Sequence, residues 1–73
     1  MRLAPSVFKR LELDEASATV TYVGEAPMGA VGSDANWKIM RLTQTGTVLS
    51  LEWADGNPNY DNVWANRTSL SYS

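Results

Sequence analysis

The chain has 73 residues, a formal net charge of −2, no cysteine and no histidine. That length allows one small domain, which buries only about 60% of the surface of its unfolded chain and is marginally stable alone. The missing cysteine and histidine exclude disulfides and the usual zinc and copper sites, so we expect oligomerisation to supply the additional stability.

The charge distribution narrows the classes of partner. Nucleic-acid-binding proteins concentrate their basic residues in a patch, whereas the six basic residues here are scattered along the chain: Arg2, Lys9, Arg10, Lys38, Arg41 and Arg67. No apolar run approaches the ~20 residues of a membrane helix, and the N-terminal residues lack the apolar core of a signal peptide. We therefore expect a protein made in the cytoplasm, with neither nucleic acid nor membrane as a partner.

The N-terminal third predicts an arm and a hairpin. Residues 1–6 contain a proline, which cannot donate to a sheet ladder, and are predicted to form an arm. Residues 7–13 alternate loosely, with Leu11 and Leu13 on one face, and are predicted to form a strand. Residues 18–23 are nearly all β-branched or aromatic, which favours a second strand after a polar turn.

Residues 24–36 form one long irregular stretch that is rich in glycine and alanine. The spacing of Gly29 and Gly32 is not a phosphate-binding loop, because no Gly-Lys-Ser/Thr follows and no helical pattern begins there. Two interpretations remain open: a crossover connection, and an extended arm that lies on a neighbouring subunit.

Residues 37–43 and 47–53 predict the central hairpin, with Gly46 in the turn. The first strand carries apolar residues on both faces, so it is predicted to be covered on both sides or bulged. The second strand alternates cleanly, with Leu49, Leu51 and Trp53 on one face. That position predicts that Trp53 belongs to the core.

The C-terminal third begins where Asp55-Gly56 ends this strand. Apolar residues at helical spacing leave room for one short helical turn near residues 60–66, and residues 68–72 alternate as a final strand. The sequence as a whole predicts a single all-β domain over residues 1–73. The expected architecture is a small antiparallel β-sandwich or open barrel of about five short strands.

The loop of residues 55–61 is the one candidate metal site. Its oxygen-bearing side chains stand at alternate positions, as in calcium loops: Asp55, Asn57, Asn59 and Asp61. Tyr60 stands where a calcium loop has glycine, and Asn66 stands where it has a bidentate glutamate. A turn hydrogen-bonded to its own side chains is the favoured interpretation, so no cofactor is expected.

The aromatic residues are candidates for the core or for an interface. They are Trp37, Trp53, Tyr60, Trp64 and Tyr72. A chain this small needs large apolar side chains for its interior, which favours the core over a sugar-binding platform. Tyr60 and Trp64 are the members most suited to an interface. Arg67 is expected to pair with Asp55 or Asp61, which would fix the C-terminal segment on the loop.

Catalysis is not expected from these residues. The chain has no histidine to act as a general base, and no serine or threonine stands in a nucleophile elbow. Nothing in the sequence brings two carboxylates together. We therefore expect a protein that is not an enzyme.

Three motifs resemble a family of short proteins encoded by tailed bacteriophages. They are Trp53-Ala54-Asp55-Gly56-Asn57, Asp61-Asn62-Val63-Trp64, and Asn66-Arg67-x-Ser69-Leu70-x-Tyr72. The resemblance covers roughly residues 19–73 and implies a structural protein of the virion or its tail. Its partners would be larger virion proteins and copies of itself, at a tail, fibre-attachment or capsid-decoration position.

Two other functions stay open at this point. One is a small binding module that recognises a host glycan or a calcium ion through residues 55–61. The other is an early phage inhibitor of a host protein, which would suit the acidic charge.

Overall fold

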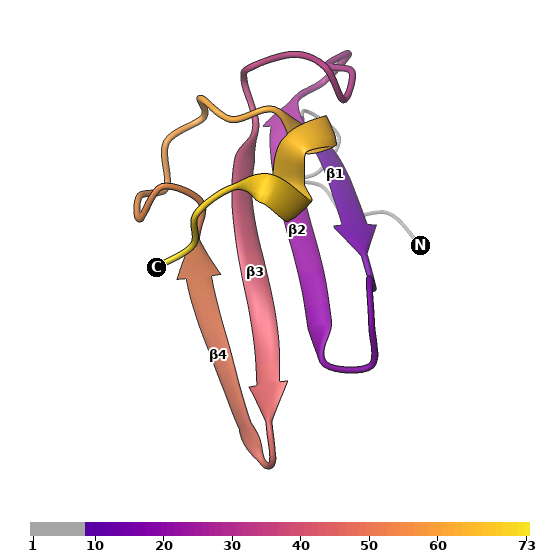
Figure 1. Cartoon of the computed structure of the whole chain (residues 1–73). Coiled ribbons are helices and arrows are strands. Elements are labelled where there is room, and N and C mark those ends of the chain that lie inside the picture. Colours follow the sequence, from indigo (N-terminus) through magenta and orange to yellow (C-terminus); the bar gives the residue numbers. More distant parts are fainter. Residues whose placement is uncertain (1–8) are drawn as a thin grey trace.

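The computed structural model describes residues 9–73. It contains four strands and one short 3-10 helix: β1 (Lys9–Asp14), β2 (Val20–Pro27), β3 (Lys38–Thr45), β4 (Val48–Trp53) and η2 (Trp64–Ser69). The strands form one antiparallel sheet in the order β1-β2-β3-β4 (Figure 1). The all-β antiparallel prediction is confirmed, with four strands in a single sheet where about five were expected. The predicted arm, residues 1–6, lies outside the described residues.

Both predicted hairpins are present. In the first, the Ser17 hydroxyl oxygen accepts hydrogen bonds from the backbone N–H groups of Thr19 and Val20, at 3.2 and 3.1 Å. In the second, Gly46 has φ of +62°, a left-handed conformation that costs little only for glycine. Serine and glycine therefore set the two turns that join β1 to β2 and β3 to β4.

The register assigns every strand residue to one of two faces, because directly paired residues in an antiparallel sheet point to the same side. Leu13 pairs with Val23, Val23 with Met40, and Met40 with Trp53, so one apolar row crosses all four strands. Tyr22, Gly24 and Ala26 alternate with this row on β2 and lie on the opposite face.

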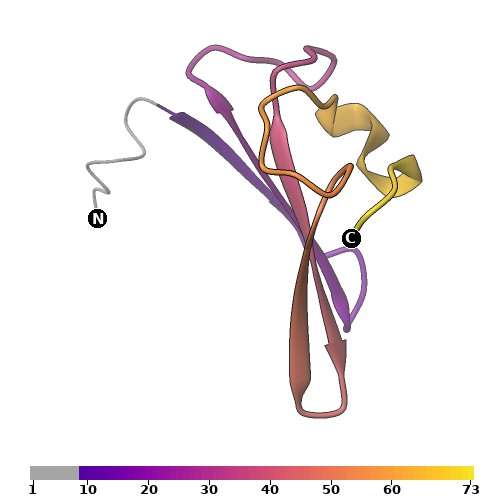
Figure 2. The same ribbon diagram turned by 90° about the vertical axis from the view of Figure 1, so that its left-hand side faces the viewer.

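The C-terminal segment, residues 62–73, covers one end of that opposite face. In Figure 1 it crosses in front of β2 and β3, in Figure 2 it lies to one side of the sheet, and in both views the far end of the β3–β4 hairpin is uncovered. The buried core lies beneath it and consists of Tyr22, Ala26, Ala30, Trp37, Ile39, Ala54 and Trp64, with Val20, Leu70 and Tyr72 packed against it. We call this side of the sheet the covered face.

Residues 68–72 do not form the predicted fifth strand. Residues 64–69 form η2 instead, and Tyr72 makes only an isolated bridge with Ala54. The segment must cross the sheet to cover the core, so it cannot run alongside an edge strand. The short helical turn occurs a little later than residues 60–66, and it starts after Val63 without a side-chain cap.

The loop prediction for residues 24–36 needs two corrections. β2 continues to Pro27, so the irregular stretch is shorter than predicted. The connection is neither a crossover nor an arm on a neighbour, because it joins adjacent strands and folds back on its own chain. Ala30 is buried, and the Gly32 carbonyl accepts a hydrogen bond from the Ala65 N–H at 3.0 Å.

Candidate functional site

The most distinctive surface of the protein is the second face of the sheet, which we call the open face. The alternation of the four strands places eight apolar side chains on it: Leu11, Leu13, Val23, Met40, Leu42, Leu49, Leu51 and Trp53. In the part of the chain that the structure describes, no second layer covers them (Figure 2).

The exposure of these side chains is unusual for a small protein. Leu13 is 69% exposed, Leu49 64% and Leu51 51%, and Leu11 is also exposed. The other four are half-buried by their neighbours in the sheet. Single exposed leucines are common on protein surfaces, but a contiguous apolar patch marks an interaction site. The open face is therefore the candidate functional site.

A charged rim borders the open face at one end. It consists of Lys9, Glu25, Lys38 and Tyr60. The Tyr60 hydroxyl donates a 2.9 Å hydrogen bond to Glu25, and both lysine ammonium groups lie over the Tyr60 ring, at 4.6 and 5.0 Å from its centroid. The exposed Tyr60 ring thus holds the loop that follows β4 against this end of the sheet.

Among the four residues of the rim, Lys38 has a shifted pKa. Burial acts to lower the pKa of Lys38, but the hydrogen bond with Tyr60 and the charge of Glu25 outweigh it and raise the pKa above its usual value. Its ammonium lies 3.5 Å from the Glu25 carboxylate. Lys38 therefore stays charged at neutral pH, and with Lys9 it gives the rim a net positive charge against the single Glu25.

The three tryptophans have different positions. Trp37 is fully buried and stacks on Trp64, with ring centroids 5.6 Å apart and planes 29° apart. The Trp37 indole N–H donates to the Val31 carbonyl at 3.0 Å, which satisfies the one polar group of a buried indole. The core prediction is confirmed for Trp37, and Trp64, which the sequence suited to an interface, also belongs to the core. For Trp53 it is wrong: Trp53 is half-buried on the open face and outside the core cluster.

Tyr72 supports the core from its edge. Its ring packs against Tyr22 at 5.8 Å, and its hydroxyl donates a 2.7 Å hydrogen bond to the Arg67 carbonyl. Burial, followed by the nearby Tyr22, raises the pKa of Tyr72 to about 12. Tyr72 is therefore a structural residue of the C-terminal segment.

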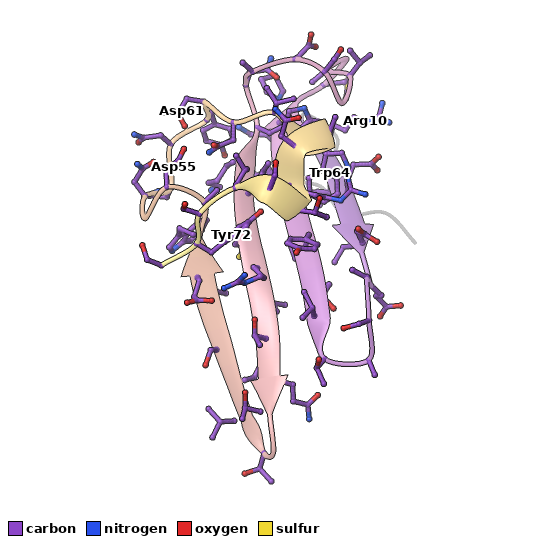
Figure 3. The ribbon with its side chains drawn as sticks, viewed as in Figure 1. Arg10, Asp55, Asp61, Trp64 and Tyr72 are labelled. Carbon is purple, nitrogen blue, oxygen red and sulfur yellow. The ribbon has the colours of Figure 1, made fainter. Side chains whose placement is uncertain are left out.

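Arg67 forms a structural ion pair, but with a different partner from the predicted one. Its Nε donates a 2.9 Å hydrogen bond to Asp14 at the end of β1, 53 residues away in the sequence. Its guanidinium also lies 4.6 Å from the Trp64 ring centroid and donates to the Trp64 carbonyl. Asp55 and Asp61 lie on the loop that leaves β4 (Figure 3) and do not pair with Arg67.

The loop of residues 55–61 is hydrogen-bonded to itself. The Asn57 side-chain oxygen accepts from the Asn59 N–H at 3.0 Å, and its amide group donates to the Asp55 carbonyl at 3.3 Å. Asp61 accepts from the Asn62 side chain. These bonds are those of an Asx turn, the favoured interpretation of this loop. Among residues 9–73 no three acidic side chains gather as a metal site would require.

Sequence reasoning finds most of the alternation of the open face but does not identify the face as a site. The alternation places Leu11 with Leu13, and Leu49 with Leu51 and Trp53, on common faces, and it predicts a core position for Trp53 alone. Val23 and Met40 were not singled out as site residues. The signal that finds them is the pairing of strands, which only the register supplies.

Comparison with known proteins adds no relative. The chain matches no protein-family model, no curated protein and no solved structure. In the described part of the chain, no helix is long and apolar enough to cross a membrane.

Proposed function

We propose that this chain is a non-enzymatic structural component of a tailed-bacteriophage particle, which acts by packing against copies of itself and larger virion proteins. One observation carries the proposal: the open face presents eight apolar side chains on a regular sheet. Such a face is suited to burial against another protein surface. The motifs around Trp53, Trp64 and Arg67 supply the phage context by resemblance.

The contacts at the two sides of the sheet support this division of roles. The covered face carries the stacked Trp37 and Trp64 and the long-range Arg67–Asp14 pair, which hold the domain together. The open face has few internal contacts to make and leaves its leucines to solvent. In such a domain, the contacts that stabilise the fold lie on one face of the sheet, and the other face is free for assembly.

The binding-module alternative gains no support from the loop of residues 55–61. Asn57 is occupied on both its oxygen and its nitrogen by neighbouring backbone groups, and Tyr60 is held by the charged rim. Calorimetric titration with calcium is therefore expected to give no heat of binding, and a glycan array is expected to give no signal.

Mass spectrometry of purified particles tests the proposal. The chain is expected in mature particles in many copies. A Leu51→Glu variant, which adds a charge to the open face, is expected to be depleted from them, whereas Val48→Glu, on the opposite face of the same strand, is expected to be incorporated normally. Presence of the chain in infected cells together with its absence from particles would contradict the proposal and favour an early inhibitor.

A further inference from the structure

We propose that the open face binds a second copy of this chain, so that two sheets pack face to face as a symmetric two-layer β-sandwich. The inference rests on the assembly role proposed above and identifies one partner, a second copy of the chain. It follows from the area of the face and the position of its charges.

The face has the area that a small dimer needs. Four strands spaced about 4.8 Å apart and about six residues long, at about 3.3 Å per residue, give a footprint of roughly 400 Å². Leucine-sized side chains raise the accessible area above this footprint. Complete overlap of two such faces would bury on the order of 1,000 Å² in total, near the lower end for specific interfaces, and the stagger of β1 relative to β4 reduces the area that aligned sheets share. A dissociation constant on the order of micromolar is expected.

The charged rim fixes the relative direction of the two copies. Lys9 and Lys38 give it a net positive charge at one end of the strands. If the strands of the two copies ran in the same direction, the two rims would lie side by side and repel each other. A two-fold axis in the plane of the face and perpendicular to the strands places the rims at opposite ends.

This two-fold axis is best placed next to Leu42 and Leu51, which are directly opposite each other on β3 and β4. Leu51 of one copy then faces Leu51 of the other. Trp53 then lies over Leu49 of the second copy and Met40 over its Gln44, while Leu11 and Leu13 of β1 lie outside the overlapping strands and both charged rims stay in solvent. Aligned sheet packing of this kind is the usual solution for two apolar sheet faces, with the layers about 10 Å apart.

A second copy of the sheet matches the open face in width. A single extended peptide covers the width of one strand, about 4.8 Å, whereas the open face is four strands wide.

Sedimentation equilibrium on the whole chain tests the dimer. The wild-type protein is expected to change from monomer to dimer across the micromolar range. Leu51→Glu is expected to raise the dissociation constant about 30-fold or more, because the dimer would bury two facing carboxylates. Val48→Glu is the matched control: Val48 is on the same strand, 60% exposed against 51% for Leu51, but points to the covered face. It is expected to dimerise like the wild type.

Cross-linking gives an independent readout if Leu51→Glu fails to fold. The chain has no cysteine, so Leu51→Cys and Val48→Cys each carry one thiol. A short bis-maleimide that spans about 10 Å, the separation of packed sheets, is expected to join two Leu51→Cys chains at high yield and Val48→Cys chains only at the background level. A monofunctional maleimide is expected to label both variants equally.

A wild-type chain that stays monomeric at millimolar concentration would overturn the proposal, as would equal cross-linking of the two cysteine variants. These results are distinguishable from failure of the assembly role. A monomeric chain that enters particles, and loses incorporation with Leu51→Glu, overturns the dimer alone and assigns the open face to a different virion protein. Absence of the chain from particles contradicts the assembly role whether or not the isolated chain dimerises.

Discussion

Gly24 lies directly beneath the indole of Trp64: a Cβ atom on Gly24 would be 2.5 Å from Cε3 of Trp64 and 3.0 Å from Cε3 of Trp37. Gly24 is in the middle of β2, where glycine is normally unfavourable. The Trp64 ring occupies the space that a side chain on Gly24 would fill. The contact between these two residues therefore sets how closely the C-terminal segment approaches the sheet.

Gly24→Ala should destabilise the fold by about 2–3 kcal/mol, because the added methyl group overpacks a rigid pair of stacked indoles. Urea unfolding followed by tryptophan fluorescence measures the cost. Gly32→Ala is the control, since its Cβ would meet Trp64 only at an ordinary 3.7 Å. Equal stabilities of the two variants would show that the C-terminal segment is free to shift away from β2.

Asp14→Asn should cost about 1 kcal/mol, since it removes the charge that holds Arg67 across 53 residues of sequence. The loss should shrink in 1 M salt, where screening weakens the pair. Thermal unfolding at low and high salt measures both effects. Glu12→Gln, which changes a more exposed carboxylate that pairs with Arg10 at 3.5 Å, should stay within about 0.5 kcal/mol of the wild type. A salt-independent loss in Asp14→Asn would contradict the ion-pair explanation.

Stability should fall as the pH rises from about 10 to about 12. The unfolded chain releases the Tyr72 proton near its usual pKa of 10.0, whereas burial, followed by Tyr22, raises the pKa of Tyr72 to about 12 in the folded chain. The stabilisation is complete below pH 10 and is lost as the pH approaches 12. After a discount for the partial exposure of the phenol, we expect a loss of about 1–2 kcal/mol.

Urea unfolding at pH 9 and at pH 11.5 checks this window. Tyr72→Phe should be less stable at pH 9, because it loses the hydrogen bond to the Arg67 carbonyl, but its stability should depend less on pH across the window. An unchanged pH dependence in Tyr72→Phe would assign the alkaline loss to other groups.

Trp37→Ala and Trp53→Ala should separate folding from association. Trp37 is fully buried, and its truncation should cost about 3–5 kcal/mol, most of the stability of a domain this small. Trp53→Ala should cost less than about 2 kcal/mol when measured on the dilute monomer, since Trp53 is half-buried. Its dimer should be weaker, which sedimentation measures. Equal losses of monomer stability in the two variants would contradict the distinction between covered and open faces.

The sequence by itself determined the local features. β-Branched and aromatic runs, serine and glycine turns, and period-two alternation identified the four strands and the two hairpins, because these signals act between neighbouring residues. Leu11 with Leu13, and Leu49 with Leu51, were correctly placed on common faces. The self-bonded turn around Asn57 also followed from the residue types.

Only the tertiary structure decided which face is covered. Both faces of the sheet carry apolar residues, and periodicity alone does not predict on which face the C-terminal segment packs. The choice depends on Gly24, whose missing side chain admits Trp64, and on the partnership of Arg67 with the distant Asp14. η2 spans residues 64–69 and so takes in the first residues of the strand that the alternation predicted over residues 68–72. These long-range contacts also leave Trp53 and its neighbours on the open face, because one short segment is too small to cover both sides of four strands.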